Sequence, residues 1–396
     1  MKGLTVKIIV TGGGTAGHIT PLLAVVSEIA IQNPSAQIRY IGQYGDKFSK
    51  QMVGSDQNIS KQSRILAGKF RRFHGRGMLW YLGHPSLILR NFRDFFYVIV
   101  GIVQSLFLLT FWRPDVVFVK GGYVGLPVGI GASLLMIPVI THDSDAIPGL
   151  TNRVVSKFAK KMAVAMPAKT YANFYSLDKV VETGVPVRED FIKGVMGKSA
   201  NKTKASLGLK PNESLLTIVG GSLGAIRLNN AFLHSLPYIL KENSNLRIFW
   251  ATGKSQYKEI NQKIGKDKLL SSRVEVRSFF DNLADIFIAS DLVVSRSGAT
   301  TLAELAIVGT PTILVPNPVL TGGHQSINAR VYTAKKACIT IEENEIEQDP
   351  SRLGYIINDV INNDTQLNSL SNNISSFAHP KASADLARLI INVGSK

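Results

Sequence analysis

Three short segments combine glycines with polar side chains in a way that suits the binding of phosphates and sugars. The first, TGGGTAGH, contains the spacing Gly12-x-Gly14-x-x-Gly17 and ends in His18. Glycines in such a turn let backbone N–H groups approach an anion at the start of a helix. The dinucleotide form of the motif also needs an acid about 20 residues further on, whereas the next strand here ends in Gly42-Gln43. A nicotinamide cofactor is therefore disfavoured, and an anion or sugar cradle and a merely tight turn both remain open.

The second segment runs from Arg296 to Glu304 and reads RSGATTLAE. Gly298 and the hydroxyls of Thr300 and Thr301 stand where a helix is expected to begin, so its free N–H groups and positive dipole end would face a diphosphate. Glu304 lies about one turn further in, where a carboxylate could accept hydrogen bonds from two ribose hydroxyls. The alternative is a negative charge that only stabilises the helix N-terminus.

The third segment, GGHQSIN (322–328), follows an apolar strand and two prolines. Polar side chains just past the carboxyl end of a strand lie where open α/β sheets bind ligands. A surface turn is the alternative interpretation.

These segments belong to a repeating unit, in which an apolar β-branched run is followed by a glycine turn and a helical pattern. The unit recurs near residues 7, 116, 215 and 292. Continuous apolar strands that alternate with helices predict parallel sheets covered on both faces. Glycine-rich first turns at 12–17 and 220–224 predict two Rossmann-like domains. The expected boundaries are an N-terminal domain at 1–187, a linker at 188–204, a C-terminal domain at 205–375 and, at 376–396, a C-terminal helix that packs back on the N-terminal domain.

The composition narrows the functional class. The chain has 396 residues, of which 45% are hydrophobic, and a single cysteine, Cys338, which fits a reducing compartment. The first residues lack the pattern of a signal peptide. A net charge of +17 favours anionic partners such as nucleic acid, an anionic membrane or phosphorylated substrates.

The basic residues gather between 61 and 93, where no acidic residue occurs and where bulky apolar side chains are interspersed. This mixture suits the interface of an anionic bilayer, while no zinc-finger, RNP-like or basic heptad pattern supports nucleic acid. A solvated basic loop is the plainer alternative. The predicted membrane patch consists of Lys69, Arg71, Arg72, Phe73, Arg76, Trp80, Tyr81 and Leu82.

The uncharged stretch 95–112 approaches the length of a transmembrane helix. Two observations argue against a span. Asp94, Tyr97, Gly101, Gln104 and Ser105 give the helix one weakly polar face. In addition, the strand that follows is expected to join the same sheet as the N-terminal strand. We therefore expect a helix that packs on a sheet and is partly exposed to lipid.

The whole set of motifs resembles the MurG-type glycosyltransferases of family 28. The matching segments, in order, are TGGGTAGHITPLLAV, KGGYVGLPVGI, THDSDAIPGLTNR, TGVPVR, GGSLGA, SRSGATTLAE and GGHQSINAR. The resemblance implies a GT-B fold, in which two Rossmann-like domains face a central cleft. It also implies transfer of N-acetylglucosamine from UDP-GlcNAc, with inversion, to the C4 hydroxyl of MurNAc in undecaprenyl-pyrophosphoryl-MurNAc-pentapeptide (lipid I), which gives lipid II for peptidoglycan synthesis.

The resemblance further implies peripheral attachment to the cytoplasmic face of the cell membrane, without nucleic acid. Cell-wall synthesis and division proteins become candidate partners. Its implied site has His18 or Asp145 as the general base, and no cofactor or metal is required. By the same resemblance, Thr15, Ala16 and Gly17 would contact the donor sugar and phosphates, and Arg188 and Ser222 would contact the phosphates. Phe280 would pair with uracil and Glu304 would hold the ribose. The pyrophosphate would bind Gly298, Ala299, Thr300 and Thr301 beside Arg296, and the sugar would meet His324, Gln325 and Asn328.

The sequence departs from the usual family motifs at three places, namely TAGH for TGGH, Val185 for an asparagine and Asp145 for an asparagine. Asp145 therefore brings a charge to the donor sugar. His18 is preferred as the base because histidine titrates near neutrality, although it could instead only donate a hydrogen bond to phosphate. The alternatives to this function are a glycolipid synthase with a diacylglycerol acceptor, a UDP-GlcNAc 2-epimerase and a non-enzymatic binding protein.

Overall fold

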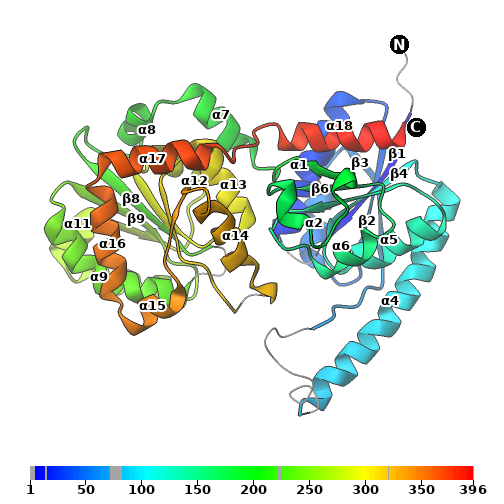
Figure 1. The fold of residues 1–396 in the computed structure, drawn as a ribbon, viewed down its shortest axis with the longest axis horizontal. Coiled ribbons are helices and arrows are strands. Elements are labelled where there is room, and N and C mark those ends of the chain that lie inside the picture. Colours follow the sequence, from blue (N-terminus) through cyan, green and yellow to red (C-terminus); the bar gives the residue numbers. More distant parts are fainter. Residues whose placement is uncertain (1–4, 14–15, 72–82, 222–224, 320, 396) are drawn as a thin grey trace. The chain divides into compact units, whose positions relative to one another are not determined.

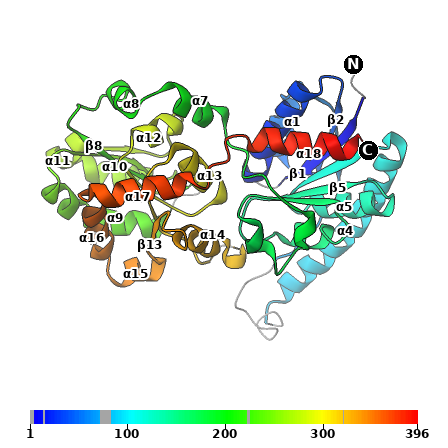
Figure 2. The same cartoon turned by 45° about the horizontal axis from the view of Figure 1, so that its top comes forward.

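The computed structural model describes residues 5–13, 16–71, 83–221, 225–319 and 321–395, without the side chains of residues 16–18, 48 and 321. The chain divides into two compact units (Figures 1 and 2). Unit 1 comprises residues 1–188 and 379–396, and unit 2 comprises residues 189–378. Each unit is a parallel sheet between layers of helices, as the alternating pattern predicts.

Unit 1 contains a seven-stranded sheet in the order β3-β2-β1-β4-β5-β6-β7. Its strands are parallel and pair in register, for example Ile8 with Val116. The elements of unit 1 are β1 (Lys7–Gly12), α1 (Ala16–Gln32), β2 (Gln37–Gln43), α2 (Lys47–Gly54), β3 (Ile59–Ile65), α4 (Pro85–Trp112), β4 (Val116–Gly121), α5 (Gly125–Leu134), β5 (Val139–Asp143), α6 (Leu150–Val155), β6 (Lys161–Val164), the 3₁₀ helices η1 (Ala168–Tyr171) and η2 (Leu177–Lys179), β7 (Val180–Glu182) and α18 (Ala382–Gly394).

Two apolar layers enclose this sheet. On one face the strands pack against α1, α2 and α18, and on the other against α4, α5 and α6. The C-terminal helix α18 contributes Leu386, Ala387 and Ile390, all fully buried, and Gln32 Nε2 in α1 donates a hydrogen bond to the carbonyl of Ala384 (3.0 Å). The last helix is therefore part of the core of unit 1.

Unit 2 repeats the same topology with six parallel strands in the order β10-β9-β8-β11-β12-β13. Its core is built around Trp250, which is fully buried on β9. The elements are α7 (Glu189–Gly197), α8 (Ala200–Ser206), β8 (Ser214–Val219), α9 (Ile226–Glu242), β9 (Leu246–Ala251), α10 (Tyr257–Gly265), α11 (Lys268–Arg273), β10 (Val274–Arg277), α12 (Leu283–Ala289), β11 (Leu292–Ser295), α13 (Ala299–Val308), β12 (Thr312–Leu314), η3 (Thr321–Gly323), α14 (His324–Thr333), β13 (Ile339–Thr340), α15 (Glu343–Gln348), α16 (Ser351–Ile361) and α17 (Asp364–Ser375).

The segment 188–204 differs from the linker expected there. It holds α7 and the start of α8, and Phe191 of α7 is fully buried against Phe287 of α12, with ring centroids 5.9 Å apart. Because α7 is amphipathic and can bury Phe191, it packs against α12 of unit 2 instead of remaining solvated. Unit 2 consequently begins at residue 189.

Helix α4 is longer than the predicted 95–112 helix, because Pro85 can occupy its first turn without losing an intrahelical hydrogen bond. Its predicted polar face is the face that packs on protein, with Asp94, Gly101 and Ser105 buried. By length and composition α4 could cross a membrane, although the strands on either side of it, β3 and β4, belong to one sheet.

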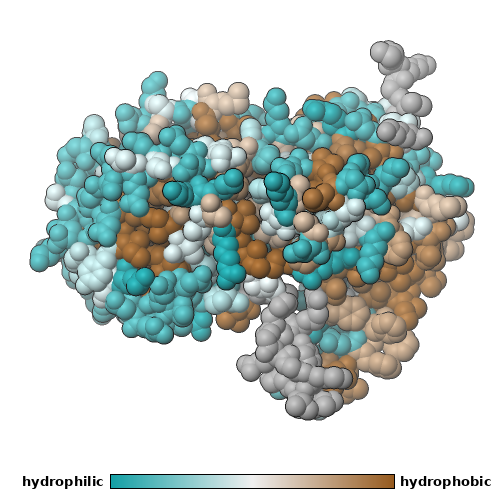
Figure 3. Space-filling view, in the orientation of Figure 1, coloured by the Kyte–Doolittle hydropathy of each residue, from teal (hydrophilic) through white to brown (hydrophobic). Residues whose placement is uncertain are grey.

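The segment 66–71 returns along this polar face of α4. The Leu66 N–H donates to Gln104 Oε1 (2.8 Å), and the Arg71 N–H donates to Asn91 Oδ1 (3.0 Å). A side chain at Gly68 would collide with the backbone of Asp94, since its Cβ would lie 1.9 Å from the Asp94 carbonyl oxygen. The opposite face of α4 is left with bulky apolar side chains in solvent, over the brown surface of Figure 3.

Candidate active site

The glycine turns of unit 1 lie where its strand order reverses, at the carboxyl ends of β1 and β4. Gly12 and Gly121 are paired across these strands. Gly122 has a φ of +77°, and a Cβ there would lie 2.4 Å from the carbonyl oxygen of Gly13. Only glycine allows the two turns to approach this closely. The turns therefore form a close-packed floor at the position where open α/β sheets bind ligands.

Helix α1 begins at Ala16, directly after the first of these turns, so the backbone of Gly17 and His18 lies in its first turn. Thr15 and the side chains of residues 16–18 lie outside the described atoms, as do Ser222 and residues 72–82 of the predicted membrane patch. The role of His18 as a base consequently stays a prediction.

A buried polar cluster lies under the loop that follows β5. Asp143 is buried and accepts hydrogen bonds from the Tyr175 hydroxyl (2.6 Å) and from Asn152 Nδ2 (2.9 Å). Burial raises the pKa of Asp143, whereas these hydrogen bonds and the charge of Lys120 act in the opposite direction. Asp145 follows two residues later and is half-buried, with its carbonyl held by the Tyr171 hydroxyl (2.9 Å). The cluster therefore anchors the loop that carries one of the two predicted bases.

Lys120 is a functional candidate that the sequence analysis did not single out. It is buried at the end of β4, and its Nζ donates a hydrogen bond to Ser144 Oγ (2.8 Å). Burial lowers the pKa of Lys120 to about 8, against the attraction of Asp143 and Asp145. The available signal was a lysine at the end of an otherwise apolar, buried strand, VVFVKG.

The corresponding turn of unit 2 follows β11, where Gly298 caps the N-terminus of α13 in an extended conformation. The first-turn N–H groups of α13 begin at Ala299, and Thr300 and Thr301 are half-buried beside them. Glu304 is 7% exposed and lies about one turn further along the helix. The predicted pyrophosphate and ribose residues thus share one helix end.

Arg296 and Asn328 hold this turn in place through buried hydrogen bonds. The Arg296 guanidinium is buried, pairs with Glu343 and donates to the carbonyl of Val315 (2.8 Å). Asn328 is fully buried, and its Nδ2 donates to the carbonyl of Ser297 (3.0 Å). Both side chains thus hold the turn in place, and their predicted contacts with the substrate stay predictions.

The GGHQSIN segment is attached to the same turn. Ser297 Oγ donates to the Gln325 carbonyl (2.8 Å), and Gln325 Oε1 accepts from the Asn317 N–H (2.9 Å). His324 begins α14 and is half-buried. The fold thus brings two of the three predicted segments, 296–304 and 322–328, into contact.

Phe280 and Arg188 occupy two further places. Phe280 is 5% exposed, stacks on Phe249 at 5.8 Å between ring centroids and lines a cavity of about 420 Å³ in unit 2. Arg188 is half-buried at the end of the first segment of unit 1. Among the residues that the structure describes, no cluster of histidine, cysteine and acidic side chains could hold a metal ion.

Two Rossmann-like units with glycine turns at the carboxyl ends of their strands define the fold class, and comparison with known proteins specifies the family. The glycosyltransferase family 28 N-terminal domain matches residues 8–164, and the C-terminal domain of the same family matches residues 215–386. The chain is a glycosyltransferase and belongs to family 28.

Two relatives match over nearly their whole length and carry the name UDP-N-acetylglucosamine--N-acetylmuramyl-(pentapeptide) pyrophosphoryl-undecaprenol N-acetylglucosamine transferase. The protein from Flavobacterium psychrophilum is 32% identical over 98% of this chain and 97% of its own. The protein from Listeria monocytogenes is 30% identical over 98% of this chain and 99% of its own.

Solved structures share the fold. MurG of Acinetobacter baumannii superimposes with a TM-score of 0.71 at 24% identity, covering 97% of this chain and 99% of its own. UDP-GlcNAc 2-epimerase from Neisseria meningitidis, bound to UDP-GlcNAc, reaches 0.63 at 13% identity, covering 98% of this chain and 99% of its own. The fold alone therefore does not separate a transferase from an epimerase.

Proposed function

We propose that this protein transfers N-acetylglucosamine from UDP-GlcNAc to lipid I and so forms lipid II for peptidoglycan synthesis. The observation that carries the proposal is the full-length similarity to relatives named for this transfer, at 30–32% identity. The match to both domains of family 28 supports it.

The donor is expected to bind unit 2. The free N–H groups at the start of α13 and the adjacent threonine hydroxyls suit the pyrophosphate of UDP. Glu304, one turn along, suits the two ribose hydroxyls, and the backbone of Phe280 suits the uracil edge. His324 and Gln325 are proposed to meet the sugar. Phosphate contacts from Arg188 and Ser222 complete the proposed donor site.

The proposed reaction is a single displacement with inversion at C1 of N-acetylglucosamine. The C4 hydroxyl of the MurNAc residue forms the new bond to C1 while the bond from C1 to the UDP oxygen breaks. Negative charge grows on the departing diphosphate, where helix N-termini can stabilise it. The hydroxyl proton passes to a general base. His18 and Asp145 are the two candidates. His18 directly follows the first glycine turn in the chain, and Asp145 follows Ser144, which is hydrogen-bonded to Lys120 beside the second turn.

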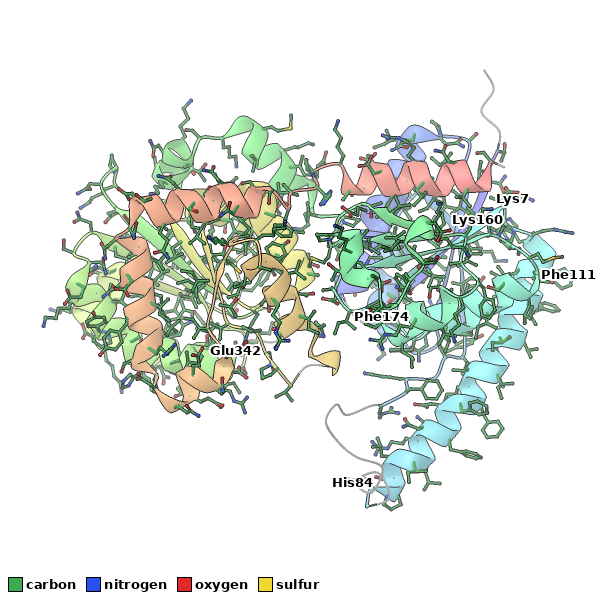
Figure 4. The ribbon with its side chains drawn as sticks, viewed as in Figure 1. Lys7, His84, Phe111, Lys160, Phe174 and Glu342 are labelled. Carbon is green, nitrogen blue, oxygen red and sulfur yellow. The ribbon has the colours of Figure 1, made fainter. Side chains whose placement is uncertain are left out.

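Unit 1 is proposed to rest on the cytoplasmic face of the cell membrane through α4 and the basic segment before it. Apolar side chains cover the solvent face of α4 along its length, which Figure 4 shows between His84 and Phe111. An apolar helix face next to cationic side chains binds anionic bilayers peripherally. The side chains that support this proposal are Ile88, Leu89, Phe92, Phe95, Phe96, Ile99, Val100, Val103, Phe107 and Phe111, all more than 40% exposed.

The decisive experiment measures transfer of radiolabelled N-acetylglucosamine from UDP-GlcNAc to a short-chain lipid I analogue by the purified protein in detergent. Formation of a β-1,4-linked disaccharide is the expected result. A diacylglycerol acceptor and a no-acceptor reaction serve as controls. Transfer to diacylglycerol alone, or conversion of UDP-GlcNAc to its 2-epimer without acceptor, would replace the proposal by one of these activities. Wall-synthesis and division proteins remain predicted partners that this assay leaves aside.

A further inference from the structure

Lys120 lies where three loops of unit 1 converge. The chain enters the turn Gly121-Gly122 directly after it, and its Cβ is the atom that a side chain at Gly12 would meet first, at 3.1 Å. Its Nζ reaches across to Ser144 Oγ, at the start of the loop after β5. Lys120 thus lies against the first glycine turn, directly precedes the second and binds the loop that carries Asp145.

Hydrogen bonds from uncharged donors reinforce the same junction. Thr151 Oγ1 donates to the carbonyl of Gly122 (2.9 Å), which ties the start of α6 to the second glycine turn. Asn152 Nδ2 bridges the carbonyl of His142 and Asp143 Oδ1, both at 2.9 Å. The loops are therefore held by several bonds, of which the one from Lys120 carries a full positive charge.

That positive charge faces two carboxylates. The negative charges of Asp143 and Asp145 both act on Lys120. The remaining titratable groups around the cluster lie on neighbouring elements, and those with resolved electrostatic effects on its members are Tyr171, Tyr175 and Arg153 on α6. Without the ammonium, the two carboxylates would leave a net negative potential at the floor of the glycine turns.

We propose that Lys120 is a positioning residue of the transfer reaction, whose ammonium holds the Ser144–Asp145 segment against the glycine turns and offsets the carboxylate charge that would otherwise repel a diphosphate. The inference rests on the proposed function, in which both substrates carry a diphosphate. It does not depend on whether His18 or Asp145 is the base, because either one would work beside the same turns.

The first test replaces the ammonium by an apolar side chain of similar length, Lys120→Met. A hydrogen bond from a charged donor and the attraction of an anionic substrate are lost together, so kcat/KM for transfer is expected to fall about tenfold to hundredfold at pH 7. Binding of UDP to the protein and its thermal unfolding are followed in parallel. A fall in activity with an intact unfolding transition distinguishes lost positioning from misfolding, and the UDP affinity shows how much of the fall comes from the donor's diphosphate.

The second test follows the pH profile. Because burial lowers the pKa of Lys120 to about 8, its positive charge is present below that pH and is lost as the pH rises through it. The kcat/KM of the wild type should therefore fall with a midpoint near pH 8. In Lys120→Arg the charge persists to higher pH, so the fall should move upward by at least one pH unit. In Lys120→Met no fall should occur near pH 8.

Two control variants distinguish loss of the Lys120 charge from a general loosening of the loops around it. Thr151→Val removes a neutral bond of the same junction, so it should lower kcat without moving the midpoint. Lys204→Met removes another largely buried lysine, which pairs with Asp291 (2.7 Å) in unit 2, and should leave the pH profile in place.

Persistence of the alkaline fall near pH 8 in an active Lys120→Met protein would overturn the inference, as would an unmoved midpoint in an active Lys120→Arg protein. Absence of transfer by the wild type itself would instead overturn the proposed function, so the two failures remain distinguishable.

Discussion

The two units share one topology and differ most in the helix that leads into the fourth strand of each. In unit 1 this helix is α4, which has 28 residues and an exposed apolar face. In unit 2 it is α12, which has seven residues, five of them buried. One fold thus gives two solutions for the same connection, a short helix buried in the core and a long helix whose apolar face extends beyond what the sheet can cover.

This difference shows that the topology does not require the exposed face of α4. Unit 2 closes the same parallel connection without any such surface, so the additional turns of α4 need a cause outside the fold. Contiguous exposed apolar surface of this extent marks an interaction site. The exposed apolar surface thus belongs to unit 1, while the motifs predicted to bind the donor, 296–304 and 322–328, belong to unit 2, so the two features can be changed separately.

The largest effect is expected in the buried helix. Phe287→Ala in α12 should lower the free energy of unfolding of unit 2 by about 3–5 kcal/mol, because it leaves a cavity at a fully buried site. Urea unfolding followed by fluorescence of Trp250, with Trp80 and Trp112 replaced by Phe, measures it. Phe107→Ala in α4, at a side chain 64% exposed, should cost less than about 0.5 kcal/mol. Equal costs would contradict the contrast between the two helices.

The second effect concerns binding instead of stability. Replacing Phe92, Phe107 and Phe111 together with Ser should weaken binding to anionic vesicles about 100-fold, since each ring loses roughly 1 kcal/mol of apolar contact with lipid. Co-sedimentation with vesicles provides the measurement. Ile31→Ser, at an exposed apolar side chain on α1, is the matched control and should bind as the wild type does. Undiminished binding of the triple variant would remove α4 from the membrane surface.

Glu304→Ala tests whether donor binding by unit 2 can be changed without changing membrane binding by unit 1. Loss of the carboxylate that is proposed to hold the ribose should raise the KM for UDP-GlcNAc about tenfold, and vesicle binding should not change. Steady-state kinetics at saturating acceptor measure the first, and co-sedimentation measures the second. Glu259→Ala, at an exposed acid on α10, should leave the KM as it is. An unchanged KM in Glu304→Ala would take Glu304 out of the nucleotide site.

The smallest expected effect lies in the segment that returns along α4. Asn91 both accepts from the Arg71 N–H and donates to the Arg71 carbonyl (3.1 Å). Asn91→Ala should therefore speed hydrogen exchange of the Arg71 amide about fivefold to tenfold. The Leu66 amide, bonded to Gln104, serves as the internal reference. Equal acceleration at both amides would indicate that the segment opens as a whole.

Much of the arrangement follows from local sequence. Apolar strands followed by glycine turns predict parallel sheets, and in such sheets the turns 12–17 and 296–298 must come to the carboxyl edge. The spacing of Asp94, Gly101 and Ser105 likewise predicts one weakly polar face, and the structure adds that this face of α4 packs on protein. These features depend only on periodicity and on residues adjacent in the chain.

The features that escaped prediction depend on contacts between distant residues. Arg296 was predicted to contact the substrate, and its pairing with Glu343, 47 residues further on, could not be predicted from any local pattern. The segment 188–204 looked like a linker because it contains two glycines and several lysines, while the burial of Phe191 depends on Phe287 of α12, almost 100 residues away. Lys120 was overlooked for the same reason, since its significance comes from Ser144 on another loop.

The contribution of α18 to the core of unit 1 has a consequence for the order in which the protein is made. A ribosome synthesises Leu386, Ala387 and Ile390 only after the whole of unit 2, although they fill the layer beside α1. Domains generally fold as units, and unit 2 has all the residues of its fold in the chain before unit 1 has. The unit that is translated first is thus completed last, and a released chain truncated shortly before residue 382 would carry one complete domain and one with an open apolar layer.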